Sequence, residues 1–185
     1  MHDRLPNASK PLTDEQRVFV ECVEDLLAST TGLQYGLLLD RDQFYMARRD
    51  PTVYAVFLLR VDPGCDLSLS IELSDRAFTV RVNRQAFRRV RGEATRFECW
   101  VERRCRDLER MINGDIRLVH KTLMTLPTSS TLEVGGESRW HKLGKTENSW
   151  LTILAFLTPY GFLMGGERRR VYKQWNRSGA VLSDH

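Results

Sequence analysis

The chain has 185 residues, of which 42% are hydrophobic and 28% are charged, and its formal net charge is +4. A chain of this size and composition can bury a core of its own, so we expect one domain over residues 1–185. Its first residues, Met1 to Pro6, contain no apolar stretch. We therefore expect no signal peptide and a cytoplasmic location.

Helix and strand patterns follow one another in the N-terminal half. Thr13 followed by Gln16 is a capping-box pattern, which predicts a helix from about residue 14 to residue 28. Apolar runs predict strands over residues 33–39 and 53–61, the second of them covered on both faces. Apolar and polar residues alternate over residues 67–82 around the turn Ser74-Asp75-Arg76, which is typical of a hairpin.

A second helix is predicted from about residue 93 to residue 112, where Asn113-Gly114 ends it. Its apolar side is formed by Phe97, Val101, Cys105, Leu108 and Ile112. Residues 116–126 then look extended, residues 127–130 form a loop, residues 131–134 form a short strand, and the stretch around Trp140 is irregular. This order predicts an α+β fold, with an antiparallel sheet of roughly five to seven strands and both helices on one face.

A long stretch without charged residues lies between Glu147 and Glu167. Pro159-Tyr160-Gly161 divides it into two halves of strand length, which favours a buried hairpin within a C-terminal sheet extension over residues 131–176. Two alternatives stay open, a partner-binding apolar patch and a membrane contact. The candidate apolar contacts are Trp150, Ile153, Phe156 and Phe162.

Positive charge is concentrated in the middle of the chain. Residues 1–80 have a net charge of −5, residues 81–121 of +6 and residues 122–185 of +3. Arginine is well suited to phosphate and carboxylate groups, which makes these residues candidates for binding an anionic surface. The candidates lie in a basic loop, on the polar side of the second helix and in the C-terminal segment: Arg88, Arg89, Arg91, Arg96, Arg103, Arg106, Arg110, Arg168, Arg169, Arg170 and Lys173.

The arginines of the second helix also have an ordinary structural explanation. Arg103 precedes Asp107 by four positions, and Glu102 precedes Arg106 by four. Ion pairs at this spacing would neutralise the stripe within the helix, as on any solvated helix face. The loop arginines have fewer such partners in the sequence and are the stronger candidates.

Four tryptophans are candidates for stacking on the bases of a single strand: Trp100, Trp140, Trp150 and Trp175. Trp100 lies at the edge of the apolar side of its helix and is expected to be either half-exposed or packed at that edge. Residues 168–175 interleave basic and aromatic side chains, which fits a contact segment. The same residues fit an edge strand whose charges discourage pairing with another chain.

The sequence has little that indicates catalysis or metal binding. Its four cysteines include no C-x-x-C pair, and we expect them to be buried free thiols. His120 and His141 stand alone, without the spacing of zinc ligands. Asp40, Asp42 and the residues around them are explained by a polar turn. No nucleotide-binding or nucleophile motif occurs, so we expect no cofactor, no metal and no enzyme activity.

These observations favour a non-catalytic interaction protein whose arginine-rich surface binds an anionic partner, either nucleic acid or an acidic protein surface. An adaptor, inhibitor or immunity-type protein that uses the apolar patch in residues 150–164 is the first alternative. A peripheral membrane protein is the second and the less favoured one. The sequence does not indicate an oligomeric state.

Overall fold

The computed structural model describes residues 11–30, 33–39, 52–61, 67–83, 85–123, 126–135, 138–147, 165–173 and 175. Within these residues the chain forms two helices and nine strands, which confirms the predicted α+β class. In chain order they are α1 (Asp14–Ser29), β1 (Gln34–Leu38), β2 (Val53–Arg60), β3 (Leu69–Ser74), β4 (Ala77–Val82), β5 (Gln85–Val90), α2 (Phe97–Asn113), β6 (Asp115–Leu123), β7 (Leu126–Gly135), β8 (Trp140–Glu147) and β9 (Gly165–Tyr172).

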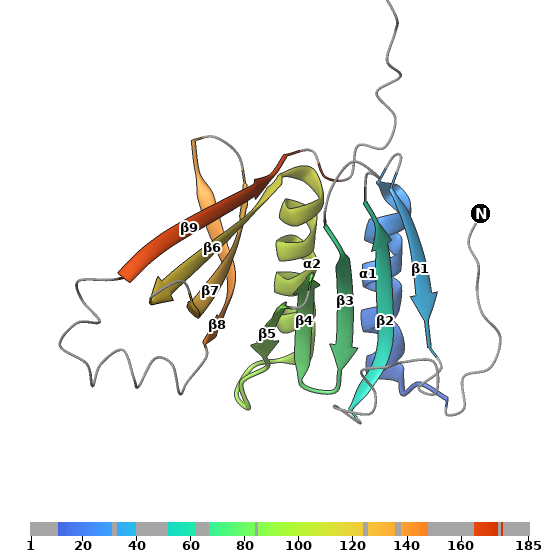
Figure 1. The fold of residues 1–185 in the computed structure, drawn as a ribbon. Coiled ribbons are helices and arrows are strands. Elements are labelled where there is room, and N and C mark those ends of the chain that lie inside the picture. The colour runs from blue at the N-terminus through green and yellow to red at the C-terminus, as the bar shows by residue number, and fades with distance from the viewer. Residues whose placement is uncertain are drawn as a thin grey trace, which may run out of the picture.

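The strands divide between two antiparallel sheets, whereas the sequence predicted a single one. The first sheet has the order β1-β2-β3-β4-β5, and both helices lie behind it (Figure 1). The second sheet has the order β8-β7-β6-β9 and lies beside the first at the β5 side. Neighbouring strands of the first sheet are also neighbours in sequence, which is why short turns suffice to connect them.

Helix α1 begins where the sequence predicted it. The Gln16 backbone N–H donates to Thr13 Oγ1 at 3.3 Å, and the Thr13 N–H donates to Gln16 Oε1 at 3.0 Å. These two bonds satisfy backbone donors that a helix start otherwise leaves without partners. The buried residues Phe19, Val23 and Leu27 then face the first sheet.

Helix α2 begins four residues later than predicted, at Phe97. A turn precedes it, in which the Thr95 N–H donates to the carbonyl of Gly92 at 3.0 Å. Trp100 is only 4% exposed and packs edge-to-face on Phe19 at a centroid distance of 5.0 Å, so of the two expected placements it is packed and not half-exposed. Trp100 is buried because it packs on Phe19 of α1, a contact that the periodicity of α2 alone does not reveal.

Three basic or polar segments for which the sequence predicted a loop or irregular structure belong to strands. The predicted basic loop is β5, which pairs with β4 from Val82–Gln85 to Ala77–Val90 and buries Phe87. The irregular stretch around Trp140 is β8, and the predicted loop over residues 127–130 belongs to β7. Each of these strands forms backbone hydrogen bonds with a neighbouring strand. It therefore needs few apolar side chains to stay in its sheet.

One hydrophobic cluster joins both helices and both sheets. The sheets meet where β5 passes β8, and a Cβ atom on Gly144 would lie 2.8 Å from the Cβ of Phe87. Glycine therefore permits this close approach. Behind the junction, Trp175 is 0% exposed and donates its indole N–H to the carbonyl of Met111 at 3.1 Å.

The cysteines differ from the expectation of free thiols. Cys22 of α1 and Cys105 of α2 form a disulfide that links the two helices. Cys99 is a free thiol as expected, but it is exposed and not buried, on a different side of α2 from Cys105. The sequence could not pair Cys22 with Cys105 because 83 positions separate them.

Some predictions fall outside the described residues, among them the C-terminal hairpin and its apolar contacts Trp150, Ile153, Phe156 and Phe162. Of the helices that the structure describes, neither is both long and apolar enough to cross a membrane. The described residues also contain no cluster of three or more His, Cys, Asp or Glu side chains suited to a metal ion.

Candidate functional site

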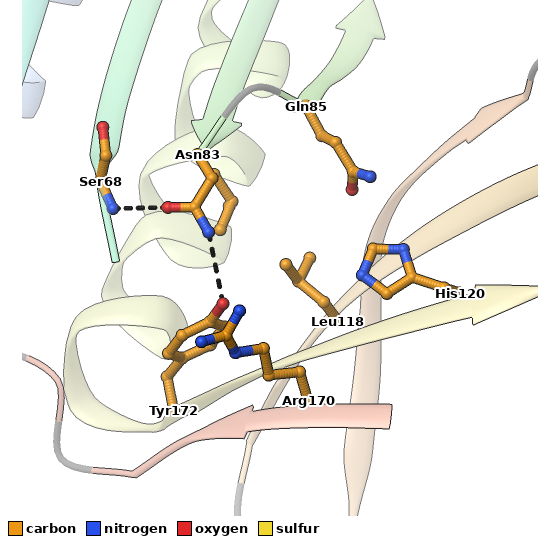
Figure 2. Close-up of a pocket in the computed structure, with 8 residues that line it drawn as sticks. Ser68, Asn83, Gln85, Leu118, His120, Arg170 and Tyr172 are labelled. Atoms are coloured by element: carbon orange, nitrogen blue, oxygen red, sulfur yellow. Dashed lines mark hydrogen bonds between the residues drawn. The ribbon is translucent and has the colours of Figure 1, made fainter. Parts of the chain in front are cut away.

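A cleft of about 580 Å³ lies between the two sheets. Residues at the ends of β3, β4 and β5 form one wall, and residues of β6 and β9 form the other (Figure 2). Most of its lining residues have polar side chains, but the surface that they expose to the cleft is more apolar than polar. The complete lining is Ser68, Val82, Asn83, Gln85, Leu118, His120, Arg170 and Tyr172.

Asn83 joins the two walls at the back of the cleft. It has a φ of 55°, a left-handed conformation that asparagine tolerates better than most residues, and this conformation turns the chain from β4 into β5. Its Oδ1 accepts from the Ser68 N–H at 2.7 Å, and its Nδ2 donates to the Tyr172 hydroxyl at 3.3 Å (Figure 2). Its side chain thus connects the first sheet to the second.

The β9 wall presents positive charge to the cleft. In the register of β6 and β9, Arg168 lies opposite His120, Arg170 opposite Leu118 and Tyr172 opposite Ile116. Because strand side chains alternate, Arg168 and Arg170 share the cleft face with Tyr172. Arg170 also lies over the Tyr172 ring, with 5.3 Å between the guanidinium carbon and the ring centroid.

His120 stands between this positive wall and β7. Its Nδ1 is 2.8 Å from Ser130 Oγ, and Ser130 is buried. Burial lowers the pKa of His120 below its ordinary value of 6.5, and the positive charge of Arg170 lowers this pKa further. His120 is therefore a neutral hydrogen-bonding group near pH 7, and it adds no charge to that of the arginines.

Gln85 contributes an amide that lacks a hydrogen-bond partner. Its Oε1 is buried and accepts no hydrogen bond from any described residue. A buried acceptor left in this state costs roughly 1–3 kcal/mol. Gln85 lines the cleft with other atoms of its side chain, because this oxygen itself is buried.

Chemically, the cleft combines positive charge, amide groups and apolar surface. Among its lining residues, all of them within the described part of the chain, none has a carboxylate. No lining residue carries a thiol or an activated hydroxyl that the contacts pair with a base. The arrangement therefore suits the binding of an anion.

The three consecutive arginines of β9 point to both faces of the second sheet. Arg168 and Arg170 face the cleft side, while Arg169 lies on the opposite face and donates to Glu167 at 2.6 Å. All three are exposed. Lys173, which follows the strand, is exposed as well.

The arginines near β5 lie in different places. Arg88 is exposed beside Thr79, on the sheet face that points away from the helices. Arg89 donates to the backbone carbonyl oxygens of Leu143 at 2.5 Å and Lys142 at 3.4 Å, which fastens β5 to β8. Arg89 thus has a structural role that its sequence neighbours did not indicate.

Arg91 is occupied by contacts within the fold. Its guanidinium lies 3.8 Å from a Glu15 carboxylate oxygen and 5.3 Å from the centroid of the Phe97 ring. It therefore connects the end of β5 to both helices.

The arginines of α2 form the outward side of that helix. Arg106 pairs with Glu102 at 3.0 Å, as the four-residue spacing predicted. Asp107 pairs with Arg104 at 3.1 Å and Arg110 at 3.8 Å, and not with Arg103 as expected. Arg96 and Arg103 are exposed. The arginines of α2 thus lie on the opposite side of the first sheet from Arg88. The predicted arginines do not all belong to one surface.

The tryptophans do not form a stacking platform among the described residues. Trp100 and Trp175 are buried in the core. Trp140 lies under Arg117, 4.2 Å from the guanidinium carbon to the ring centroid, and Arg117 also pairs with Glu133. Trp150 lies outside the described residues.

Sequence reasoning missed Ser68, Asn83, Gln85 and Tyr172 as site residues, and it dismissed His120 as isolated. One signal was present for β9, since alternate residues Arg168, Arg170 and Tyr172 share a face if the segment is a strand. Nothing in the sequence indicated that this face lies against the turn between β4 and β5.

Lowering the pH should destabilise the fold through His120. Below pH 6.5 the unfolded chain takes up a proton that folded His120 resists, so its contribution to stability falls as pH decreases through this value. We expect His120→Gln to lose less stability than the wild type between pH 7.5 and pH 5.5, in urea denaturation at both pH values. Identical losses in the two proteins would contradict this prediction.

Comparison with models of known protein families, with curated proteins and with solved structures finds no match for this chain. Its function therefore has to be inferred from the chemistry of its own surface.

Proposed function

We propose that this chain is a non-catalytic interaction protein that binds an anionic partner along β9 and the mouth of the cleft. The observation that carries the proposal is the position of Arg168, Arg169 and Arg170. All three are exposed on the outermost strand of the second sheet. They extend into solvent at an edge where no further described strand covers them.

Their arrangement supports this choice over the other arginine groups. The outward side of α2 alternates arginines with Glu98, Glu102 and Glu109, and its ion pairs offset much of the positive charge. Arg89 and Arg91 are held by contacts within the fold. On the cleft side of β9, Arg168 lies opposite His120 and Arg170 lies opposite Leu118 in the strand pair.

A partner with closely spaced negative charges would meet two guanidinium groups on one face of β9. Side chains at alternate strand positions are roughly 7 Å apart along the strand, a distance that successive phosphates or carboxylates can match. Arginine can hold each such group through two parallel hydrogen bonds. The same charges discourage the exposed edge from pairing with another copy of the chain.

The proposal is tested by the salt dependence of binding. We expect a labelled single-stranded oligonucleotide or polyglutamate to bind the wild type, with affinity falling steeply as salt increases. For the two arginines on one face of β9, log K should fall against log salt with a slope of about −1.4 on a single strand. Fluorescence anisotropy at several salt concentrations measures this slope. Failure of both probes to bind at low salt, or binding that salt does not weaken, would refute the proposal.

A further inference from the structure

We propose that the cleft takes one oxyanion group beside Arg170, and that His120 takes up a proton when this group binds. The proton makes His120 a third positive group next to Arg168 and Arg170, so the anion binds more tightly as the pH falls. This inference rests on the proposed function and deepens it, because it gives the same site a regulation by pH. The oxyanion belongs either to the larger partner or to a free small anion, and the experiment distinguishes the two sources.

His120 lies where the basic face of β9 meets the cleft. It lines the cleft together with Arg170, and Arg168 lies directly opposite it in the register of β6 and β9. Its Nδ1 is 2.8 Å from Ser130 Oγ, which leaves Nε2 as the ring nitrogen that can contact a ligand. Figure 2 shows the imidazole ring at one side of the cleft and Arg170 at another. An anion in the cleft can therefore approach a guanidinium and an imidazole at once.

The described groups that face His120 are positively charged or uncharged. From β9 it faces Arg168 and Arg170. From β7 it faces Ser130, and the next position across the sheet, on β8, is Thr146. Three uncharged residues line the cleft from the first sheet: Ser68, Asn83 and Gln85. Among the described residues, the charges that face His120 thus oppose its protonation, and a bound anion would offset them.

These surroundings determine the direction of the coupling. Burial lowers the pKa of His120 and the charge of Arg170 lowers it further, so without an anion the imidazole is neutral near pH 7. An opposite charge within about 4–6 Å favours the charged form of a titratable group, so a bound anion must raise the pKa of His120. By linkage, the anion then binds more tightly at low pH, and this gain is lost as the pH rises through the raised pKa.

The test uses sulfate, whose charge is constant between pH 5.5 and pH 7.5. We expect NMR titration of the His120 ring signals to give a higher pKa in sodium sulfate than in sodium chloride of the same ionic strength. The affinity for sulfate should increase about tenfold from pH 7.5 to pH 5.5. Equal pKa values of His120 in the two salts, or a sulfate affinity that does not change with pH, would overturn the inference.

Replacement of His120 isolates the proton. His120→Gln keeps a side chain that forms hydrogen bonds but takes up no proton, so its affinity for sulfate should be the same at both pH values. The control is His141→Gln, because His141 lies on β8 and is not among the residues that line the cleft. This control should keep the increase of the wild type. Loss of the pH dependence in both variants, or in neither, would contradict the role of His120.

Arg170→Gln tests the other side of the anion site. Without sulfate, the variant should have a higher pKa at His120 than the wild type, because the charge of Arg170 lowers this pKa. Its affinity for sulfate should fall about tenfold, since it lacks the charged hydrogen-bond donor. An undiminished effect of sulfate on His120 would show that the anion binds elsewhere. If the variant is poorly folded, the titration of the wild type in the two salts still decides the question.

A single-stranded oligonucleotide of thymidines distinguishes the two sources of the anion, because its charge is also constant over this pH range. If its affinity rises at pH 5.5 as that of sulfate does, the group in the cleft belongs to the partner. If only sulfate shows the increase, the cleft takes a free small anion.

The outcomes also separate this inference from the proposed function. Salt-sensitive oligonucleotide binding, without a pH effect on either ligand, would leave the proposed function standing and reject the proton-coupled site. Failure of both the oligonucleotide and polyglutamate to bind, while sulfate still raises the pKa of His120, would reject the proposed function and keep the anion site.

Discussion

Replacing Arg168 and Arg170 together by glutamine is expected to weaken binding of a single-stranded oligonucleotide about 100-fold. Both side chains lie on the cleft face of β9 and are exposed. A hydrogen bond to a charged group contributes at least about 1.5 kcal/mol net, and about 1.4 kcal/mol corresponds to a tenfold change in affinity. Fluorescence anisotropy at fixed salt measures the loss, and the salt slope should become shallower by about 1.4.

The matched control is Arg103→Gln combined with Arg106→Gln on α2. It removes the same two positive charges from a formal net charge of +4. These residues lie on the outward side of the helix, where Arg106 already pairs with Glu102. We expect a change in affinity of about threefold or less, as long-range attraction alone would give in moderate salt. Equal losses in the two double variants would show that net charge, and not β9, governs binding.

Stability measurements complete this comparison. Substitution of exposed residues away from caps and buried contacts usually changes stability by no more than about 0.5 kcal/mol. Arg170 also lies over Tyr172, so the β9 double variant should lose slightly more stability than its control. Urea denaturation of both variants, run beside the binding assay, separates loss of the site from loss of the fold.

The elements that the sequence predicted well are those whose signals are local. The capping box, a motif of four residues from Thr13 to Gln16, predicts the start of α1. The structure contains both of its hydrogen bonds. The hairpin over residues 67–82 alternates apolar and polar residues, and β3 pairs with β4 in register. Such patterns arise from neighbours in the chain, so no knowledge of the tertiary fold is needed to recognise them.

The missed strands lack that local signal because their contacts come from elsewhere in the chain. In β5, Arg89 occupies an inward position and is satisfied by the backbone carbonyls of Leu143 and Lys142 on β8. In β8, position 144 leaves no room for a side chain, because the Phe87 side chain lies directly against Gly144. An arginine and a glycine in these positions look like loop residues until the two sheets are placed together.

The candidate site was hidden for the same reason. Gln85 is separated in sequence from His120 and Arg170, and only the packing of the second sheet on the end of the first brings them to one cleft. The sequence did identify Arg168 and Arg170, but as part of a broad basic surface. The structure places the side chains of Arg168 and Arg170 on one face of β9 and that of Arg169 on the opposite face. The candidate site therefore contains fewer arginines than the surface that the sequence predicted.

Trp175→Ala is expected to cause the largest loss of stability, about 3–5 kcal/mol, as is usual when a buried tryptophan is truncated. Trp175 is 0% exposed and donates its indole N–H to the carbonyl of Met111. That carbonyl lies in the last turn of α2, where the helix leaves its own carbonyls without N–H partners. Trp175 therefore fills the core and also caps the end of a helix.

Trp175→Phe separates the two contributions. Phenylalanine keeps most of the buried surface but cannot donate a hydrogen bond, so the Met111 carbonyl loses its partner at a cost of about 1–3 kcal/mol. Val171→Ala is the control, because Val171 belongs to neighbouring β9 and is 42% exposed. Its loss should stay near about 0.5 kcal/mol. Equilibrium urea denaturation of the three variants measures these differences.

The same variants decide between two interpretations of the segment over residues 168–175. If Trp175 were a contact residue that stacks on a partner, Trp175→Ala would leave stability nearly unchanged and would weaken oligonucleotide binding directly. If Trp175 belongs to the core, Trp175→Phe should remain folded and bind the oligonucleotide as the wild type does, because its effect is confined to the end of α2. The arginines of β9 would then carry the binding, and the aromatic residues after them, Tyr172 and Trp175, would hold that strand in place.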